Sequence, residues 1–328
     1  MAIKSMKVLN IMAFHQKELD LQFGDGINIL IGENGMGKTT LLKMIYAALQ
    51  YSIENQTSGK ELIHFFSNNL RDFSQMKYPG KEKDTCYYEI SDGQHFFKDY
   101  LTKKNGIVSE GWKGLNIQSV FIPTTEMLSH SKGFLAMNQK YNMPFDETQI
   151  DIIVNASLPE TKKVSKSCEI ILKEISDVIN GKVVQEDDTF YIVKNDGRKI
   201  DFSLEAEGMR KLGLLWKLIR NGLLEKNSVL LWDEPEANLN PELYPLVANI
   251  LLALQKNGVQ IFLATHSYNF AKYLEIRRTE KEQVLIHNLY RNDLGKEIMS
   301  VSAYKMEDLE PNHIMMADNQ LLDEVYNM

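Results

Sequence analysis

The residues best suited to chemistry lie in a glycine-rich segment near the start of the chain. Residues 32–39 read GENGMGKT and match the phosphate-loop pattern G-x-x-x-x-G-K-[ST]. Glycines let backbone N–H groups turn toward phosphate oxygens, and the helix that follows directs its positive dipole end at the anion. Lys38 would reach the β- and γ-phosphates, and the Thr39 hydroxyl would ligate Mg²⁺. The residues predicted to contact the nucleotide are Asn34, Gly35, Met36, Gly37, Lys38, Thr39 and Thr40.

Two acids at the end of an apolar segment form the second candidate element. Residues 229–232 read VLLW and predict a buried strand, which Asp233 and Glu234 follow directly. At the carboxyl end of a strand beside a phosphate loop, Asp233 can hold Mg²⁺ through water. Glu234 is then placed to take a proton from an attacking water. We therefore predict Asp233 as a metal residue together with Thr39, and Glu234 as a catalytic base.

A histidine follows the next apolar segment. Residues 259–265 read VQIFLAT and predict another buried strand, and His266 comes directly after it. An isolated histidine is most often a surface or core residue. One strand after the two acids, however, His266 can contact the γ-phosphate and the attacking water, so it is the second predicted catalytic residue.

The flanking segments predict the fold that positions these residues. A strand at 27–31 precedes the loop and a helix at 40–49 follows it. Alternating buried strands and helices are typical of a mainly parallel sheet covered on both faces. We therefore expect an α/β fold with a mixed, mainly parallel core sheet. The C-terminal third carries this alternation at 212–224 (helix), 228–232 (strand), 243–256 (helix) and 259–265 (strand).

The other segments predict additions to this core. The pattern predicts N-terminal strands, expected to be antiparallel, at 7–11 and 17–23, and closing strands at 283–287 and 297–301. The middle of the chain is less regular, which favours an α+β insertion at 51–199 within a domain formed by 1–50 and 200–328. Its expected elements are a hairpin of 86–90 and 94–98, a strand at 118–122, a helix at 169–179 and two strands around 195–197.

Composition narrows the class of protein. The 328 residues carry 44 acidic and 37 basic side chains, a net charge of −7, which argues against a surface that coats nucleic acid throughout. Two cysteines give neither a disulfide framework nor a metal-ligand spacing. No stretch approaches the roughly 20 apolar residues of a membrane span. These features predict a cytoplasmic protein without a membrane partner.

In motif content and order, the chain resembles the ABC-like P-loop ATPases of the RecF, SMC and OLD group. The shared motifs are GENGMGKT, then D-E-P-E-x-x-L from Asp233, then Thr265-His266-Ser267. The resemblance covers residues 1–50 and about 200–303, and is closest to stand-alone bacterial ATPases related to the OLD family. It implies ATP and Mg²⁺ as cofactors and a homodimer or higher oligomer joined through the ATP sites. It also implies a nuclease or toxin as partner effector, in anti-phage defence.

One part of the resemblance departs from the family pattern. These relatives offer a signature segment with a serine to the γ-phosphate of a second subunit, and residues 204–211 (LEAEGMRK) occupy that place here. Ala206 stands where the serine is expected. Gly208 and the start of the following helix still supply backbone N–H groups, so the resemblance implies that Ala206 and Gly208 contact nucleotide in trans. Binding of ATP is expected, whereas rapid hydrolysis is an open question.

Several features leave alternatives. Glu126 either faces the metal site through water or caps a helix start.

Lysines and arginines at two places keep nucleic acid as a candidate partner, and the acidic C-terminal helix is either a docking element or a solvated end. The 61 residues after Ser267 are too few for a further catalytic domain, so an effector is expected on another chain. The basic residues are Lys162, Lys163, Lys166, Lys272, Arg277, Arg278 and Lys281.

Three other functions compete with an ATP-hydrolysing switch. The first is a RecF- or SMC-like DNA-repair ATPase, which would show ATP-dependent DNA binding with a steep salt dependence. The second is a nucleotide-gated scaffold with little turnover, which the alanine at position 206 favours. The third is a transporter's nucleotide-binding subunit, against which stands the missing L-S-G-G-Q signature.

Overall fold

The computed structural model describes residues 2–54, 62–67, 75–80, 85–101, 106–141, 143–279, 283–292 and 297–327. Its centre is a six-stranded sheet in the order β14-β13-β3-β12-β11-β7. All neighbours pair in parallel except β14, which is antiparallel to β13. The mixed, mainly parallel sheet predicted from the sequence is confirmed. Its strands are β3 (Ile27–Gly32), β7 (Ser119–Ile122), β11 (Val229–Asp233), β12 (Gln260–Ala264), β13 (Val284–Arg291) and β14 (Ile298–Ala303).

A second sheet is antiparallel throughout, in the order β2-β1-β4-β5-β6. Buried and more exposed residues alternate along its first strands, as expected when one face packs on a core. The predicted N-terminal strands and the hairpin are therefore present and share one sheet. The strands are β1 (Ser5–Leu9), β2 (Leu19–Gln22), β4 (Tyr87–Ser91), β5 (Phe96–Asp99) and β6 (Ile107–Glu110).

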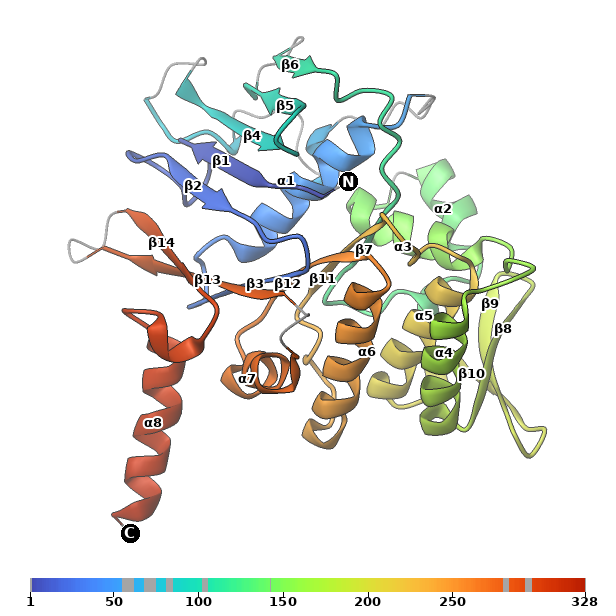
Figure 1. Cartoon of the computed structure of the whole chain (residues 1–328). Coiled ribbons are helices and arrows are strands. Elements are labelled where there is room, and N and C mark those ends of the chain that lie inside the picture. The colour runs from blue at the N-terminus through green and yellow to red at the C-terminus, as the bar shows by residue number, and fades with distance from the viewer. Residues whose placement is uncertain are drawn as a thin grey trace.

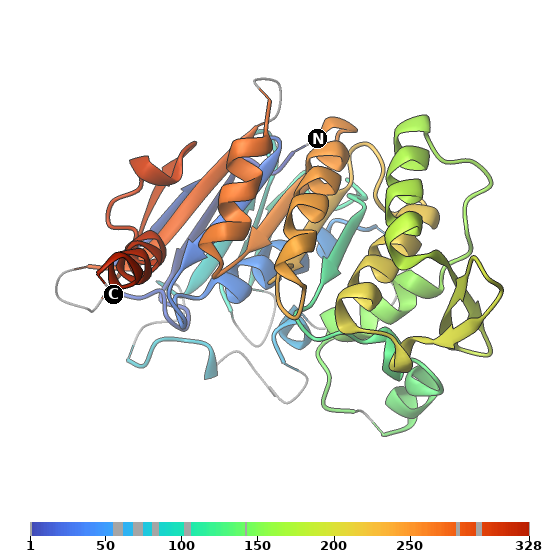
Figure 2. The ribbon, with the colours of Figure 1, turned by 90° about the horizontal axis from the view of Figure 1, so that it is seen from below.

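Helices fill the space between and beside the sheets. Helix α1 (Lys38–Tyr51) packs between the two sheets, in a core formed by apolar residues of both (Figure 1). Helices α6 (Tyr244–Lys256) and α7 (Tyr268–Arg277) cross the opposite face of the six-stranded sheet, drawn in orange in Figure 2. The buried strands of the sheet are thus covered on both faces, as their continuous apolar sequence requires.

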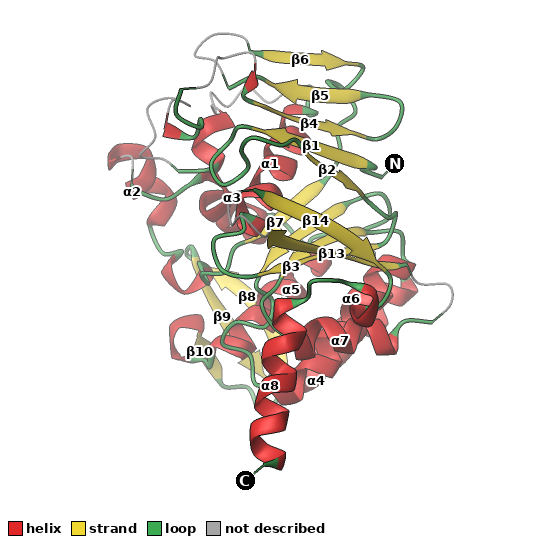
Figure 3. Ribbon diagram, turned by 90° about the vertical axis from the view of Figure 1, so that its left-hand side faces the viewer, coloured by secondary structure: helices red, strands yellow, loops and turns green. Residues whose placement is uncertain are grey.

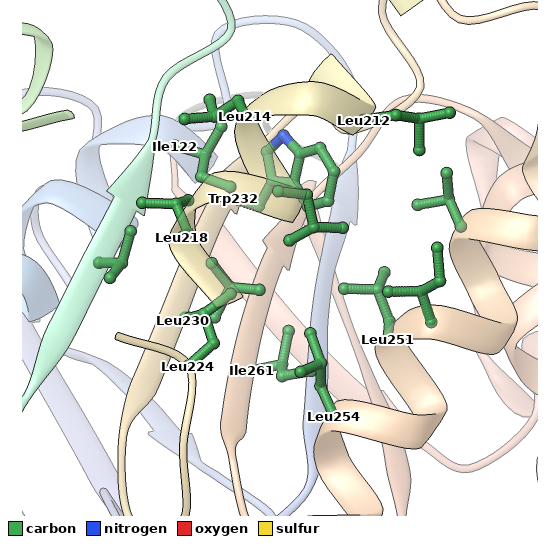
Figure 4. Close-up of a cluster of buried hydrophobic side chains, with 14 of the residues drawn as sticks. Ile122, Leu212, Leu214, Leu218, Leu224, Leu230, Trp232, Leu251, Leu254 and Ile261 are labelled. Atoms are coloured by element: carbon green, nitrogen blue, oxygen red, sulfur yellow. The ribbon is translucent and has the colours of Figure 1, made fainter. Parts of the chain in front are cut away.

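The remaining helices and a third sheet extend the same core. Figure 4 shows Leu218 of α5, Trp232 of β11 and Leu251 of α6 converging in it. The helices are α2 (Phe134–Tyr141), α3 (Glu147–Ser157), α4 (Lys166–Ile179), α5 (Glu207–Arg220) and α8 (His313–Tyr326), and the sheet joins β8 (Gly181–Glu186), β9 (Thr189–Lys194) and β10 (Lys199–Asp201). Short 3₁₀ turns lie at Leu62–Phe65, Leu128–His130, Phe202–Leu204, Pro241–Leu243 and Met306–Asp308.

Some predicted boundaries were wrong. The helix predicted at 212–224 starts at Glu207 and stops at Arg220, because Gly222 adopts a left-handed φ of 76°. The N–H groups of Gly222 and Leu223 then bond to the carbonyls of Ile219 and Leu218, a Schellman end. The first strand ends at Leu9 and not at residue 11, since the turn that follows uses positive φ angles.

The C-terminal helix α8 leaves the body of the molecule and projects away from both sheets (Figure 3). It meets the rest of the chain at its first turns, near α7 and the end of β3. Among the described residues, no helix combines the length and the apolar character needed to cross a membrane.

The turn from β3 into the glycine-rich loop generates a stability prediction. Gly32 has a φ of 141°, and a Cβ built on it would lie 2.3 Å from the backbone oxygen of Leu289. Gly32→Ala should therefore lower the free energy of unfolding by about 3 kcal/mol or more, since backbone must shift. Gly133, with a φ of 67° and open space around it, is the matched control. Gly133→Ala should cost only about 1 kcal/mol. If urea denaturation gave equal losses in the free energy of unfolding for the two variants, the steric requirement for glycine at position 32 would be contradicted.

Candidate nucleotide-binding site

The glycine-rich loop joins β3 to α1 beneath the N-terminal sheet. Gly35 and Gly37 adopt positive φ angles of 79° and 83°, which only glycine adopts without strain. A Cβ on Gly37 would also lie 2.4 Å from the Phe14 ring, so this turn excludes other residues. Asn34 and Gly35 are exposed. The Met36 side chain is buried in the core, so this predicted contact is limited to its backbone.

Lys38 is the buried cation of the site. Its Nζ lies 2.8 Å from the Gly32 carbonyl, 3.0 Å from the Glu33 carbonyl and 3.2 Å from His266 Nδ1. Burial lowers the pKa of Lys38 from 10.5 to about 8, against the opposing pull of nearby carboxylates, chiefly Glu234. The ammonium is thus held in place, but the nearby carboxylates do not fully offset the cost of burying its charge. An anionic ligand would supply the missing stabilisation.

Oxygen atoms gather at the other end of the loop. The Thr39 hydroxyl donates to the carboxylate of Asp233, at 3.0 and 2.9 Å from its two oxygens. Thr124, at the end of β7, donates to the same carboxylate over 3.1 Å. Burial raises the pKa of Asp233 above its ordinary value, while the two hydroxyls oppose that rise. Asp233 and Thr39 therefore meet, as the sequence predicted.

These donors fit Mg²⁺ and suit few other metals. All are hard oxygen atoms, and only one is a carboxylate. Within the described residues, no group of three or more His, Cys, Asp or Glu side chains could hold a metal by itself. Mg²⁺ commonly takes one or two protein ligands and fills its shell with water and substrate phosphates. Thr39 and Asp233 would be those ligands.

Glu234 and His266 come together on neighbouring strand ends. His266 Nε2 lies 3.0 Å from Glu234 Oε1. Since the Lys38 ammonium can only donate, His266 Nδ1 accepts from it and Nε2 carries the proton toward Glu234. Glu234 has a φ of 50°, the left-handed region that non-glycine residues seldom adopt. A chain of polar contacts thus runs from Lys38 through His266 to Glu234.

Three contributing residues were not identified from the sequence. Thr124 is one of them, and the second is Glu236, which accepts from Thr265 Oγ1 at 2.5 Å and from the His266 N–H at 3.1 Å. Glu236 thereby orients the turn that carries His266. The third, Lys211 of α5, donates to the carbonyls of Glu234 and Ala237. The second glutamate of D-E-P-E, Glu236, was a usable signal, whereas nothing in the sequence distinguished the side chains of Thr124 and Lys211 from their neighbours.

The hypothesis that Glu126 faces the metal was wrong. Its Oε1 accepts from the N–H of Leu128 at 2.5 Å, and the carboxylate pairs with Arg210 at 3.2 Å. The alternative, a cap at the start of a helical turn, is the arrangement observed. Thr124, two residues earlier, occupies the place expected of Glu126.

Ala206 and Gly208 lie at the start of α5. Ala206 is the N-cap residue and makes no side-chain cap hydrogen bond. A Cβ on Gly208 would lie 3.2 Å from Leu239 Cδ1, so α5 begins beside the loop that carries the two acids. Neither residue lines the pocket beside the glycine-rich loop. Their contact with nucleotide in trans stays a prediction.

That pocket has a volume of about 590 Å³. One wall is the first half of the glycine-rich loop, a second is the turn from His266 into α7, and a third is α8. Thr40, at the other end of the loop, has its Oγ1 3.9 Å from Met12 Sδ. The residues lining the pocket are Gly32, Glu33, Asn34, His266, Ser267, Tyr268, Asn269, His313, Ile314, Ala317, Asp318 and Leu321.

The predicted basic clusters are largely engaged within the chain. Lys272 contacts Glu275 at 2.8 Å, and Arg277 donates to Asn249 over 3.0 Å. Arg278 donates to the Val284 carbonyl over 3.0 Å. Lys162 and Lys163 line a separate pocket of about 540 Å³ that also contains a carboxylate. Lys281 lies outside the described residues.

Comparisons with known proteins match this geometry. Residues 133–271 match the family described as "AAA domain, putative AbiEii toxin, Type IV TA system". The RecF protein of Clostridium kluyveri is 32% identical over 122 residues, 37% of this chain and 28% of the relative. That of Streptococcus uberis is 28% identical over 228 residues, 68% and 59% of the two chains. The chain thus spans less than two thirds of either relative's length.

Solved structures support the fold. The SMC head domain from Thermotoga maritima matches with a TM-score of 0.53 at 15% identity, over 92% of this chain and 99% of that one. An SMC head derived from Pyrococcus furiosus, bound to the C-terminal domain of ScpA, matches with a TM-score of 0.51 at 11% identity, over 99% of both. The chain shares the fold of SMC head domains and is similar in sequence to RecF proteins. The ABC-like head expected from the sequence is confirmed as its fold.

The lowered pKa of Lys38 generates a prediction about pH. A bound triphosphate stabilises the ammonium form and so raises the pKa of Lys38 above about 8. ATP affinity should therefore be independent of this group below pH 8 and fall by up to about tenfold per pH unit above it. Calorimetric titration with a non-hydrolysable ATP analogue in two buffers should show little proton uptake at pH 7 and close to one proton at pH 9.

Lys211 supplies the control, because burial also lowers its pKa. The Lys211→Met protein should keep the proton uptake if Lys38 is its source. Loss of the uptake in that variant, or its absence from the native protein, would contradict the assignment to Lys38.

Proposed function

We propose that this protein is an ATP-binding and ATP-hydrolysing switch that dimerises around nucleotide and controls a partner effector. The observation that carries the proposal is the chain of contacts from Lys38 through His266 to Glu234, next to the oxygen cluster of Thr39 and Asp233. It combines a phosphate-binding cation, a metal-binding pair and a base in one place. The similarity to RecF proteins and SMC heads supports the same reading.

Each side chain has a distinct task in this proposal. Lys38 binds the γ-phosphate, and His266 holds that phosphate and the attacking water in line. The oxygen of the attacking water forms a bond to the γ-phosphorus while Glu234 accepts a proton from that water. The bond between the γ-phosphorus and the ADP oxygen breaks at the same time. Mg²⁺, held by Thr39 and Asp233, would neutralise charge on the phosphates. ADP and phosphate are released.

A route exists from the site to the middle of the chain. We assign residues 1–50 and 200–328 to the ATPase domain and 51–199 to an insertion. Helix α1, which begins with Lys38, contacts α3 of that insertion through two pairs. Lys43 Nζ lies 2.6 Å from Asp146 Oδ2, and Tyr46 donates to Asp151 over 3.0 Å. A displacement of the glycine-rich loop on binding ATP would move α3 with it.

The cellular setting follows from chemistry and from one comparison. We place the protein in the cytoplasm, where ATP is available and cysteines stay reduced. The description of the matched family includes the words "putative AbiEii toxin, Type IV TA system", which supports a defence role with an effector or antitoxin on a second chain. Its affiliation with the OLD family is part of the same proposal.

A scaffold that binds ATP and hardly hydrolyses it is the second candidate. The specific observation is Ala206, which caps α5 without a hydroxyl. In a two-fold dimer, that helix start would face the partner copy's γ-phosphate without the donor that a serine supplies. The two candidates differ in turnover and agree on binding.

Substitution of the base tests the leading candidate. Glu234→Gln should reduce ATP turnover by about 100-fold or more, because a general base is lost, while ATP binding and the ATP-dependent dimer persist. Lys38→Ala should abolish both binding and dimerisation. Steady-state phosphate release and analytical ultracentrifugation with ATP measure the two effects. Glu242→Gln, an exposed acid nearby, is the control and should behave as the native protein. Normal turnover in Glu234→Gln would refute the assigned base.

Restoring the missing hydroxyl tests the role assigned to Ala206, whereas the phosphate-release rate of the native protein separates the two candidates. Ala206→Ser should raise turnover several-fold, since a serine adds a donor for the γ-phosphate of the partner copy. The same serine should stabilise the fold by about 1 kcal/mol as an N-cap. Stabilisation without faster phosphate release would show that Ala206 does not face nucleotide in the dimer. The gain in turnover should vanish in Ala206→Ser combined with Glu234→Gln.

A further inference from the structure

Helix α8 presents an apolar face that nothing in the described chain covers beyond its first turns. Ile314 and Met315 are half-buried, and Ile314 packs against the core. Further along, the side chains are exposed: Leu321 60%, Leu322 47%, Val325 58% and Tyr326 85%. At about 100° per residue, these six lie within an arc of about 140°. These side chains therefore share one face of α8, which packs on the body at its start and is exposed along the part of the helix that projects from the body (Figure 3).

The base of α8 is firmly built. Asn312, only 2% exposed, caps the helix by accepting from the Met315 N–H, and its amide donates to the Met306 carbonyl over 3.0 Å. Asn288 of β13, also 2% exposed, donates to the Pro311 carbonyl. The projecting position of α8 is thus held by buried hydrogen bonds. A frayed terminus would show no such anchoring.

Acidic residues surround the exposed face. On the helical projection, Glu324 borders it on the Leu321 side and Asp323 on the Tyr326 side, each about 60° away, and Asp318 lies within it. Helix α8 contains three carboxylates and neither lysine nor arginine. The helix therefore combines an apolar stripe with a strongly negative border.

We propose that α8 is the docking helix for a basic partner protein that presents an apolar groove rimmed by lysine or arginine. An amphipathic helix seated in a groove is a common mode of recognition, with anchors three and four residues apart. The acidic residues that border the apolar face of α8 favour a groove whose rim carries lysine or arginine, because opposite charges then meet. The same charge disfavours other occupants, because α8 of a second copy and an anionic membrane surface would both repel these carboxylates.

The location links docking to ATP. The inner side of α8 forms a wall of the pocket that also contains Asn34 and His266, and Leu321 belongs to both surfaces. At the base, Glu275 of α7 accepts from the Met306 N–H at 2.8 Å, which ties α8 to the helix that follows His266. The affinity for a partner bound between α8 and α7 would therefore change when nucleotide binds beside Asn34 and His266. This dependence on nucleotide rests on the proposed function, whereas the docking of the partner on α8 does not.

The first experiment identifies the occupant. The full-length protein carries photoreactive p-benzoylphenylalanine at Leu322 in cells of the source organism. A second protein carries it at Ile276 of α7, which is 61% exposed, as control. The expected result is an adduct with one basic protein from position 322 and none from 276. An adduct with a second copy of this chain, an adduct with lipid, or no adduct overturns the proposal.

The second experiment measures binding of the purified adduct protein to the full-length chain. Leu322→Ser with Val325→Ser, and separately Asp323→Lys with Glu324→Lys, should each weaken the Kd at least tenfold. Raising NaCl from 50 to 300 mM should also weaken it. Ile276→Ser should stay within twofold. If neither pair of α8 substitutions changes the Kd, the proposal is overturned, even if an adduct forms.

Nucleotide dependence separates this inference from the proposed function. If the native protein binds the partner differently with and without ATP, and Lys38→Ala does not, both stand. If binding depends on α8 but ignores ATP, docking stands and nucleotide control of the partner fails. If ATP turnover behaves as proposed while α8 variants bind normally, only the docking inference fails.

Discussion

The candidate site depends on the parallel pairing of β3, β12 and β11. Register places the ends of these strands at one edge of the sheet, with Asp233 beside Ala264 and Ala264 beside Leu30. Lys38, Glu234 and His266 follow those ends and meet although more than two hundred residues separate the first from the last. Without the shared strand direction, the three motifs would be unrelated turns. The chemistry is therefore a consequence of sheet topology.

Prediction from sequence was strongest where backbone constraints are local. The glycine-rich loop, the apolar strands and the end of α4 at Ile179 were recognisable because each depends on neighbouring residues. Thr124 and Lys211 were missed, since each side chain reaches the site only through tertiary packing. The sequence was compatible with two positions for the Glu126 side chain, facing the metal or capping a helical turn. The observed cap is accompanied by an ion pair with Arg210, which is eighty-four positions away in the sequence.

Two halves of the site differ in how completely this chain provides them. Lys38, Thr39, Asp233, Glu234 and His266 lie together within one copy, held by Glu236 and Lys211. Ala206 and Gly208 sit on α5 beside the acid-bearing loop, outside the pocket. Because α5 contacts that loop directly through Lys211, a second copy seated against the start of α5 would also press on the turn that carries Glu234. Dimerisation and catalysis are mechanically connected in the proposed switch.

The position of β3 in the sheet has a consequence for synthesis of the chain. β3 ends at Gly32, yet its two sheet neighbours are β12 and β13, which end at Ala264 and Arg291. At roughly 5–20 residues per second, a ribosome leaves this strand, every residue of which is buried in the folded protein, unpaired for about ten seconds to almost a minute. The candidate site cannot assemble until most of the polypeptide has emerged. A nascent chain of this topology is thus exposed to aggregation and to chaperones before the candidate site forms.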